Sequence, residues 1–223
     1  MLQLEHRVKC LDSGVTAVDG KPGGSARRTR TGDVRGALVD ATAHVLERDG
    51  VAALTVRTVA AEAGVAPMGV YNHFAGKPGL LVAVLIRGFD GLRDAITVRT
   101  PLPYLSKLRA AGHGYRRFAL SSPVTYGLMF GGSPAPPDAE LETSAEAAFQ
   151  ALVDLVVLGQ AGSDLIAGDP YDIALRIWAT VHGAVSLEIA GSAKILDAEG
   201  TYERILDLIE RGLAPPGRST IRS

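Results

Sequence analysis

The residues with the most distinctive chemistry form a short predicted helix, PMGVYNH, at residues 67–73. Val70 and Phe74, four residues apart, share a face that can pack on a core. The other residues of this segment point outward and combine small, aromatic, amide and imidazole groups: Met68, Gly69, Tyr71, Asn72 and His73. Such a row contributes little to the stability of so short a helix. We therefore interpret it as a contact surface, and its chemistry suits the reading of DNA.

The elements that must position this helix are encoded directly before it. Thr55 can cap a first helix by accepting a hydrogen bond from an unpaired backbone N–H. Four apolar residues share one face of that helix: Val56, Val59, Ala60 and Ala63. Gly64 can end it in a left-handed conformation, Val65 can fill the angle that follows, and Pro67 suits the first turn of the next helix. The segment Leu54–Phe74 is therefore predicted to be a helix-turn-helix.

Composition excludes several classes of function. The chain has 223 residues, 47% of them hydrophobic, which is enough to bury a sizeable core. One cysteine, Cys10, and five scattered histidines give neither a disulfide nor zinc-ligand spacing, so we expect no metal and no cofactor. No run approaches the ~18 uncharged apolar residues of a membrane helix, and the first thirty residues lack a signal-peptide core, so we expect a cytoplasmic protein without a membrane partner. A hydrolase using His113 or His182 is the enzyme alternative, but no nucleophile motif supports it and we expect no enzyme.

The charges are unevenly distributed along the chain. Residues 1–130 hold 17 Lys and Arg against 10 Asp and Glu, whereas residues 131–223 hold 6 against 14. This split suits a chain whose first part meets a polyanion. Residues 1–30 read as a flexible tail whose basic end, 21–30, resembles an arm along DNA, although basic tails also serve as solubilising segments.

Helical periodicity continues through the rest of the chain, and no strand-like alternation occurs. We expect a first helix from about Thr31 to Gly50 and a long helix after Lys77. Further expected helices cover 104–119, in which Gly112 and Gly114 allow a bend, then 123–130, 139–159, 170–190 and a last one capped by Thr201. The fold class is therefore all-α. The predicted domains are a tail at 1–30, a three-helix unit at 31–76, a helical bundle at 77–214 and a tail at 215–223.

At this point the pattern resembles the TetR family of bacterial transcription regulators. The family's signature is matched by Thr55, Val59-Ala60, Ala63-Gly64-Val65, Val70-Tyr71, His73-Phe74, Lys77 and Leu80. A second match, Trp178 with His182-Gly183, resembles a subgroup with a Trp-His-Gly motif in the ligand domain. The sequence departs from the family pattern at three positions. Ala66 lacks the usual side-chain cap, and at Met68 and Gly69 the register of the helix can shift.

The resemblance implies a homodimer formed through residues 170–190 and 201–213, and a palindromic operator as the double-stranded DNA partner. It places Tyr71, His73 and Lys77 near phosphates, with Thr55 capping its helix. It assigns base reading to four residues of the second helix: Pro67, Met68, Gly69 and Asn72. Arg57 of the preceding helix is a further possible base contact. Asn72 can pair with adenine through two hydrogen bonds.

The resemblance also implies a small-molecule effector, bound between the helices of the second domain. The candidate lining is apolar and aromatic: Phe118, Tyr126, Met129, Phe130, Phe149, Leu152, Trp178 and His182. Such residues favour an apolar or aromatic effector, although each of them also fits a plain core. The expected function is a repressor that the effector releases from its operator. The alternative is a helical ligand-binding protein without functional DNA binding.

Overall fold

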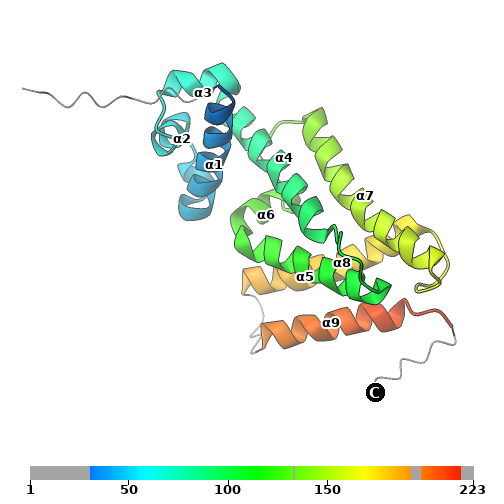
Figure 1. The fold of residues 1–223 in the computed structure, drawn as a ribbon. Helices are drawn as coiled ribbons and strands as arrows, with labels where there is room; N and C mark the ends of the chain where they lie inside the picture. Colours follow the sequence, from blue (N-terminus) through cyan, green and yellow to red (C-terminus); the bar gives the residue numbers. More distant parts are fainter. Residues whose placement is uncertain (1–30, 133, 192–196, 217–223) are drawn as a thin grey trace, which may run out of the picture.

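The computed structural model describes residues 31–132, 134–191 and 197–216, and all regular structure within them is helical (Figure 1). The all-α prediction is therefore confirmed. The elements are α1 (Thr31–Asp49), a 3-10 turn η1 (Val51–Ala53), α2 (Val56–Glu62), α3 (Pro67–His73), α4 (Gly76–Ile96), α5 (Tyr104–Ser121), α6 (Pro123–Phe130), α7 (Ala139–Ala161), α8 (Pro170–Ala190) and α9 (Ala198–Gly212). The predicted basic tail at 1–30 and residues 217–223 lie outside the described residues.

The helix α4 belongs to both parts of the molecule and runs from one to the other (Figure 1). Its first half is buried together with α1, α2 and α3 in a small core that includes Leu38, Leu46, Leu54, Val59, Val70, Leu80 and Leu85. Its second half contributes Leu92 to the larger core formed by α5–α9. A displacement of α4 within the bundle must therefore reach the helix-turn-helix unit, because both cores contain it.

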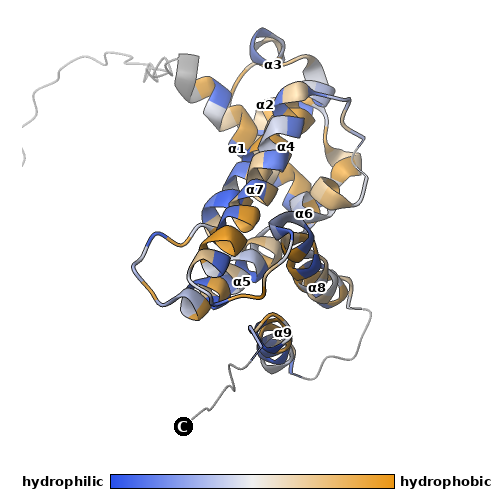
Figure 2. Ribbon diagram, turned by 90° about the vertical axis from the view of Figure 1, so that its right-hand side faces the viewer, coloured by the Kyte–Doolittle hydropathy of each residue, from blue (hydrophilic) through white to orange (hydrophobic). Residues whose placement is uncertain are grey.

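The helix α9 lies across the end of the bundle that is remote from α1–α3, as the two ribbon views show (Figures 1 and 2). It packs on α8 and α5 through Tyr202, Leu206 and Ile209. Arg109 of α5 fixes it further through three ion pairs with carboxylates of α9. Polar residues colour the opposite side of α9 in Figure 2, so one apolar stripe anchors this helix.

One sequence-based expectation for these helices needs correction. The expected cap of the last helix, Thr201, lies inside α9; the cap is Asp197, whose carboxylate accepts a hydrogen bond from Gly200 N at 2.8 Å. The helix α5 runs unbroken through Gly112 and Gly114, at which the sequence allows a bend. A Cβ at Gly112 would lie 2.7 Å from Leu206, and one at Gly114 would collide with the Ala95 carbonyl oxygen. These glycines serve close helix packing instead.

The helix α8 has the length and mean hydropathy of a membrane span, the one such helix in the described ranges. Only 28% of its apolar window is buried inside this chain, although α8 packs on α5, α7 and α9. Large apolar side chains on its surface include Tyr171, Leu175 and Leu187. An apolar helix of a helical bundle with so much open surface is typical of a contact with a further subunit.

Candidate DNA-binding surface and effector cavity

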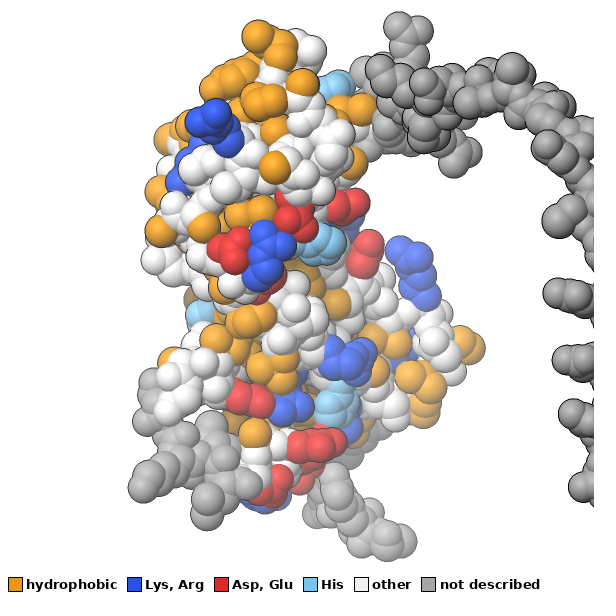
Figure 3. Space-filling model, turned by 90° about the vertical axis from the view of Figure 1, so that its left-hand side faces the viewer, with side chains coloured by type: hydrophobic (Ala, Val, Ile, Leu, Met, Phe, Trp, Pro, Cys, Tyr) orange, Lys and Arg blue, Asp and Glu red, His pale blue; other side chains and the backbone are white. Residues whose placement is uncertain are grey.

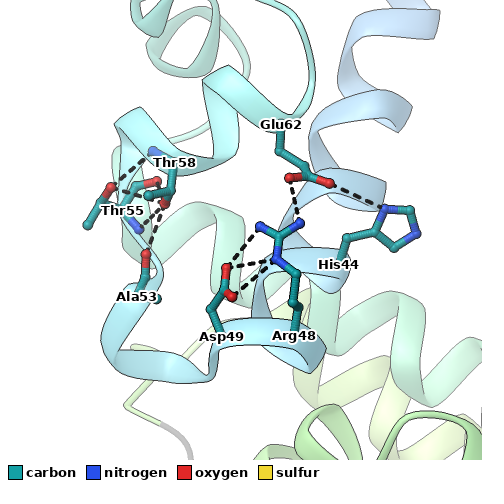
Figure 4. Close-up of polar contacts among 7 residues, drawn as sticks. All are labelled: His44, Arg48, Asp49, Ala53, Thr55, Thr58 and Glu62. Carbon is teal, nitrogen blue, oxygen red and sulfur yellow. Dashed lines mark hydrogen bonds and ion pairs between the residues drawn. The ribbon is translucent and has the colours of Figure 1, made fainter.

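The first helix of the helix-turn-helix is capped as predicted. The Thr55 hydroxyl accepts a hydrogen bond from Thr58 N at 3.1 Å, and the Thr58 hydroxyl accepts one from Thr55 N at 2.9 Å. This reciprocal capping box satisfies two N–H groups at the start of α2. The Thr58 hydroxyl also donates to Ala53 O at 2.9 Å, which ties α2 to η1 (Figure 4).

The turn and the second helix also follow the predicted plan. Gly64 has a φ of 67°, and Val65 N donates to Ala60 O at 2.9 Å, which closes the end of α2. The cap position of α3 is Ala66, which makes no side-chain hydrogen bond, and Pro67 occupies the first turn. Pro67 needs no N–H partner, so it offsets part of the missing cap.

The outer face of α3 is open to solvent. Met68 is 68% exposed and Tyr71 60% exposed, whereas Val70 is fully buried beneath them. Of the other residues predicted to meet DNA, Thr55, Arg57, Pro67 and Asn72 are exposed, and Gly69, His73 and Lys77 are half-buried. Large apolar and aromatic side chains in water cost stability, so their exposure favours a contact surface.

Lys77 has an intramolecular partner: its ammonium donates to Val51 O at 3.2 Å and so links the start of α4 to η1. No Asp or Glu occurs between Ala63 and Phe89. Consistently, Figure 3 shows hydrophobic, uncharged and Lys or Arg side chains at the upper end of the molecule, with the acidic side chains of that face farther down. On the face that Figure 3 shows, the described side chains at the α3 end therefore include no carboxylate that would repel phosphates.

A cluster of charges behind α2 holds the helix-turn-helix on α1. The Arg48 guanidinium binds Asp49 at 2.9 Å and Glu62 of α2 at 3.0 Å, and Glu62 also lies 3.9 Å from His44 (Figure 4). The hydrogen bond from Arg48 lowers the pKa of Asp49. These groups are largely exposed, so we expect them to orient α2 more than to stabilise the fold.

A cavity of about 310 Å³ lies between the helices of the second domain. Its wall is mainly apolar and aromatic and comes from α4 to α9; it includes Phe89, Leu92, Leu108, Tyr115, Phe130, Phe149, Leu152, Trp178 and Leu206. The volume and the apolar wall fit a small organic molecule. The part of the chain that the structure describes contains no cluster of three or more His, Cys, Asp or Glu that could hold a metal.

A polar cluster borders this cavity. The hydroxyl of Tyr126 lies 2.7 Å from His182 Nδ1 and 2.9 Å from the Tyr115 hydroxyl, and Trp178 Nε1 donates to Tyr115 at 3.2 Å. Burial lowers the pKa of His182 and raises the pKa of Tyr115 and of Tyr126. Each of these groups is therefore held in its neutral form, and the cluster supplies hydrogen bonds without charge.

Two family models match the chain. One, described as bacterial regulatory proteins of the tetR family, matches residues 38–84 and so includes the helix-turn-helix. The other, a tetracyclin repressor-like C-terminal domain, matches residues 108–209 and includes most of the cavity wall. The chain belongs to the TetR family. Members of this family are ligand-responsive, dimeric regulators of transcription that bind operator DNA.

Similar proteins support this assignment. An uncharacterized helix-turn-helix regulator of Mycobacterium tuberculosis, Rv0681, is 25% identical over 201 residues, which are 84% of this chain and 83% of Rv0681. The uncharacterized regulator YobS of Bacillus subtilis is 28% identical over 101 residues, 44% of this chain and 51% of YobS, so the match spans about half of YobS. A solved protein of unknown function from Rhodococcus sp. RHA1 is 29% identical, with a TM-score of 0.73 over 84% of this chain and 99% of that one.

In this TetR-family chain, half of the predicted ligand residues line the cavity: Phe130, Phe149, Leu152 and Trp178. The other four do not. The sulfur of Met129 packs against Gly88 of α4, and the ring of Phe118 packs against Gly91. Tyr126 and His182 belong to the polar cluster behind the wall. These four residues are not part of the cavity wall, so their contact with an effector stays a prediction.

Sequence reasoning missed other wall residues, including Phe89, Leu92, Tyr115, Tyr171 and Leu175. Their helical spacing marked several of them as apolar or aromatic, but spacing alone cannot separate a residue beside a cavity from a residue beside another helix. Arg109 and Glu210 also border the cavity and are paired with each other at 2.9 Å. The two residues are 101 positions apart in the sequence, so no local pattern predicted their ion pair.

A contact between the two parts of this regulator was not predicted either. The carboxylate of Glu47, near the end of α1, accepts hydrogen bonds from Val124 N at 3.0 Å and Thr125 N at 2.8 Å. It also accepts one from the Thr125 hydroxyl at 2.7 Å. Ser122, the cap position of α6, makes no side-chain cap of its own. Glu47 therefore caps α6 from the DNA-binding unit.

Proposed function

We propose that this protein is a repressor that binds a palindromic operator as a homodimer and leaves it when a small apolar or aromatic effector occupies the cavity. The observation that carries the proposal is the presence of both sites in one chain: an exposed α3 on a capped helix-turn-helix, and an apolar cavity of about 310 Å³. The regulator acts by binding and not by catalysis, in the cytoplasm where its DNA lies.

At the operator, α3 enters the major groove. Asn72 and Arg57 are exposed and present an amide and a guanidinium that can bond to base edges, while Pro67, Met68 and Gly69 approach bases with apolar atoms. Tyr71, His73 and Lys77 meet phosphates. The amino terminus of α2 also faces the backbone, and Thr55 contributes there by holding its first turn in place.

The dimer forms through α8 and α9, near residues 170–190 and 201–213. Support comes from the open apolar surface of α8, on which Leu187 is 53% exposed, and from Leu208 of α9, which is 59% exposed. Pairing these faces in two copies would bury them. The two α3 helices then need to lie about 34 to 36 Å apart to enter successive major grooves.

Two connections transmit occupancy of the cavity to α3. Phe89, Leu92 and Ile96 of α4 belong to the cavity wall, and the first half of α4 packs on the helix-turn-helix. Phe130 of α6 also belongs to the wall, and Glu47 of α1 holds the other end of α6. A ligand that displaces α4 and α6 changes the spacing of the α3 helices, so ligand and DNA weaken each other, with a coupling of about 1 to 3 kcal/mol as is typical.

A gel-shift titration with the DNA upstream of its own gene, at two salt concentrations, tests the proposal. The protein should bind in a sequence-dependent manner and with an affinity that falls steeply with salt. Lys77→Ala should reduce the salt slope by about 1 without a change of sequence preference. Lys107→Ala, which removes a half-buried lysine from α5, is the matched control and should leave the slope unchanged.

Asn72→Ala should instead relax the preference at one base pair, by about 1 to 3 kcal/mol. Thermal unfolding of each variant separates loss of contact from loss of fold. If no DNA is bound in a sequence-dependent manner while small molecules still occupy the cavity, the protein is a ligand-binding protein without DNA binding and the proposal is wrong.

A further inference from the structure

The wall of the cavity offers no unpaired charge to a ligand, as far as the described residues go. Its ionised residues are Arg109 and Glu210, which bind each other at 2.9 Å. The other nitrogens of Arg109 bind Glu203 at 2.6 Å and Asp207 at 2.5 Å. Because this guanidinium already has three carboxylate partners from α9, the carboxylate of a ligand would have to compete with all of them.

Three wall residues carry a neutral polar group: Tyr171, which is 57% exposed, and Tyr115 and Trp178, which belong to the hydrogen-bonded cluster. Trp178 Nε1 donates to the Tyr115 hydroxyl at 3.2 Å. The Tyr115 hydroxyl lies 2.9 Å from the Tyr126 hydroxyl and 3.1 Å from His182 Nδ1. The Tyr126 hydroxyl lies 2.7 Å from the same nitrogen. This cluster is the place where an apolar ligand can make a polar contact.

The positions of the protons in the cluster decide which kind of hydrogen bond remains for a ligand. The 2.7 Å separation of Tyr126 and His182 Nδ1 is typical of a hydroxyl donor, and on this ground we assign Nδ1 as the acceptor. The neutral imidazole then carries its proton on Nε2, 3.4 Å from the Ser186 hydroxyl. The N–H of Trp178 and the hydroxyls of Tyr115 and Tyr126 are therefore all donated within the cluster. What remains for a ligand is a lone pair on a hydroxyl oxygen.

We propose that the cavity selects an uncharged aromatic or bulky apolar molecule that carries one O–H or N–H group, which donates a hydrogen bond to the hydroxyl oxygen of Tyr115. This inference rests on the proposed function, in which the cavity is the effector site. The ligand is uncharged because an ion buried without a partner is strongly penalised. It carries a hydrogen-bond donor because the lone pairs of an acceptor-only ligand would be repelled by the lone pairs of the Tyr115 hydroxyl oxygen.

Three para-substituted benzenes that differ in one group test this choice: 4-tert-butylphenol, 4-tert-butylanisole and 4-tert-butylbenzoate. The first is a neutral donor, the second a neutral acceptor, and the third an anion. Isothermal titration calorimetry gives the affinities, and the fluorescence of Trp178, the single tryptophan of the chain, reports occupancy of the cavity. We expect the phenol to bind about tenfold more tightly than the anisole. We expect the benzoate to bind least.

Tyr115→Phe removes the proposed acceptor and should abolish the preference of the protein for the phenol over the anisole. The matched control is Tyr104→Phe on the same helix, which also removes a buried tyrosine hydroxyl but lies outside the cavity wall. The control should keep the tenfold preference. Thermal unfolding checks that both variants are folded, so that a changed preference in Tyr115→Phe reports on the contact itself.

Equal or tighter binding of the anisole would overturn the inference, as would tighter binding of the benzoate or a preference that survives Tyr115→Phe. The gel-shift experiment distinguishes this failure from a failure of the proposed function. If the operator is bound specifically and only the ligand preference is wrong, the inference fails and the regulator function stands. If no operator is bound, the proposed function itself fails.

Discussion

Glu47 should carry part of the coupling between the cavity and the DNA-binding unit. Its carboxylate accepts three hydrogen bonds from α6, two of them from the backbone N–H groups of Val124 and Thr125. Pro123, at the start of α6, has no N–H, and Ser122 supplies no side-chain cap. Glu47→Ala would therefore leave the first N–H donors of α6 without their protein partner and would disconnect α6 from α1.

The size of this effect can be worked out from the contacts that are lost. An N-cap contributes about 0.5 to 2 kcal/mol, and a hydrogen bond to a charged group about 1.5 to 3 kcal/mol. Thr125 is 5% exposed, so water replaces the carboxylate poorly. We expect Glu47→Ala to lower the free energy of unfolding by about 2 kcal/mol. If the same energy couples the two sites, the effect of a ligand on operator affinity falls by up to about thirtyfold.

The assay is fluorescence anisotropy of a labelled operator, with and without the tightest-binding benzene of the series above. Glu47→Ala should bind the operator but respond weakly to the ligand. Asp49→Ala is the matched control, because it removes a carboxylate from the same turn of α1 that binds Arg48 and not α6. The control should respond like the wild type. A full ligand response in Glu47→Ala, with unchanged thermal stability, would refute the reasoning.

Three further predictions concern stability. Tyr104 has a buried hydroxyl without a hydrogen-bond partner, so Tyr104→Phe should raise the free energy of unfolding by about 1 kcal/mol in urea titrations. Arg109→Met leaves three carboxylates of α9 without their shared cation, so the unfolding midpoint should fall by an amount equivalent to about 2 kcal/mol and recover partly with added salt. Burial lowers the pKa of His182 in the folded protein, so its contribution to stability is complete above about pH 6.5 and is lost as the pH falls. His182→Asn should therefore lose less stability than the wild type when the pH falls from about 7.5 to 5.5, and no difference in the calorimetric midpoints would contradict this reasoning.

The helix-turn-helix could be predicted almost residue by residue because its interactions connect near neighbours. The cap of Thr55, the left-handed turn at Gly64 and the proline at the start of α3 each depend on groups within a few residues. Such local chemistry is visible in sequence. The cap of α9 shows where this fails: Thr201 and Asp197 are both good capping residues four positions apart, and only the position of the backbone decides between them.

The cavity could be predicted only in outline because it depends on how six helices are rotated about their axes. Phe118, Met129 and Phe130 are all large apolar residues on predicted helices, so the sequence does not distinguish their surroundings. Phe130 lines the cavity, whereas Phe118 and Met129 fill the space that Gly91 and Gly88 leave on α4. The glycines of α5 are a second example. In the sequence they suggest a bend, but in the structure they allow Leu206 and the Ala95 carbonyl to approach α5 closely. The role of such a glycine can be assigned only when the neighbouring residue that fills the space of its missing side chain is known.

The short helix α6 touches the cavity, the polar cluster and the DNA-binding unit. Phe130 at its end touches the cavity, Tyr126 in its middle joins the polar cluster, and Thr125 near its start is held by Glu47 of the DNA-binding unit. Eight residues make a helix about 12 Å long, short enough to move as one rigid body. In the proposed mechanism, we therefore expect a ligand that displaces Phe130 or draws a hydrogen bond from the cluster to shift the end that Glu47 holds. In the proposed mechanism, α6 thus links the cavity directly to α1 of the DNA-binding unit, and α4, which belongs to both cores, is the second connection.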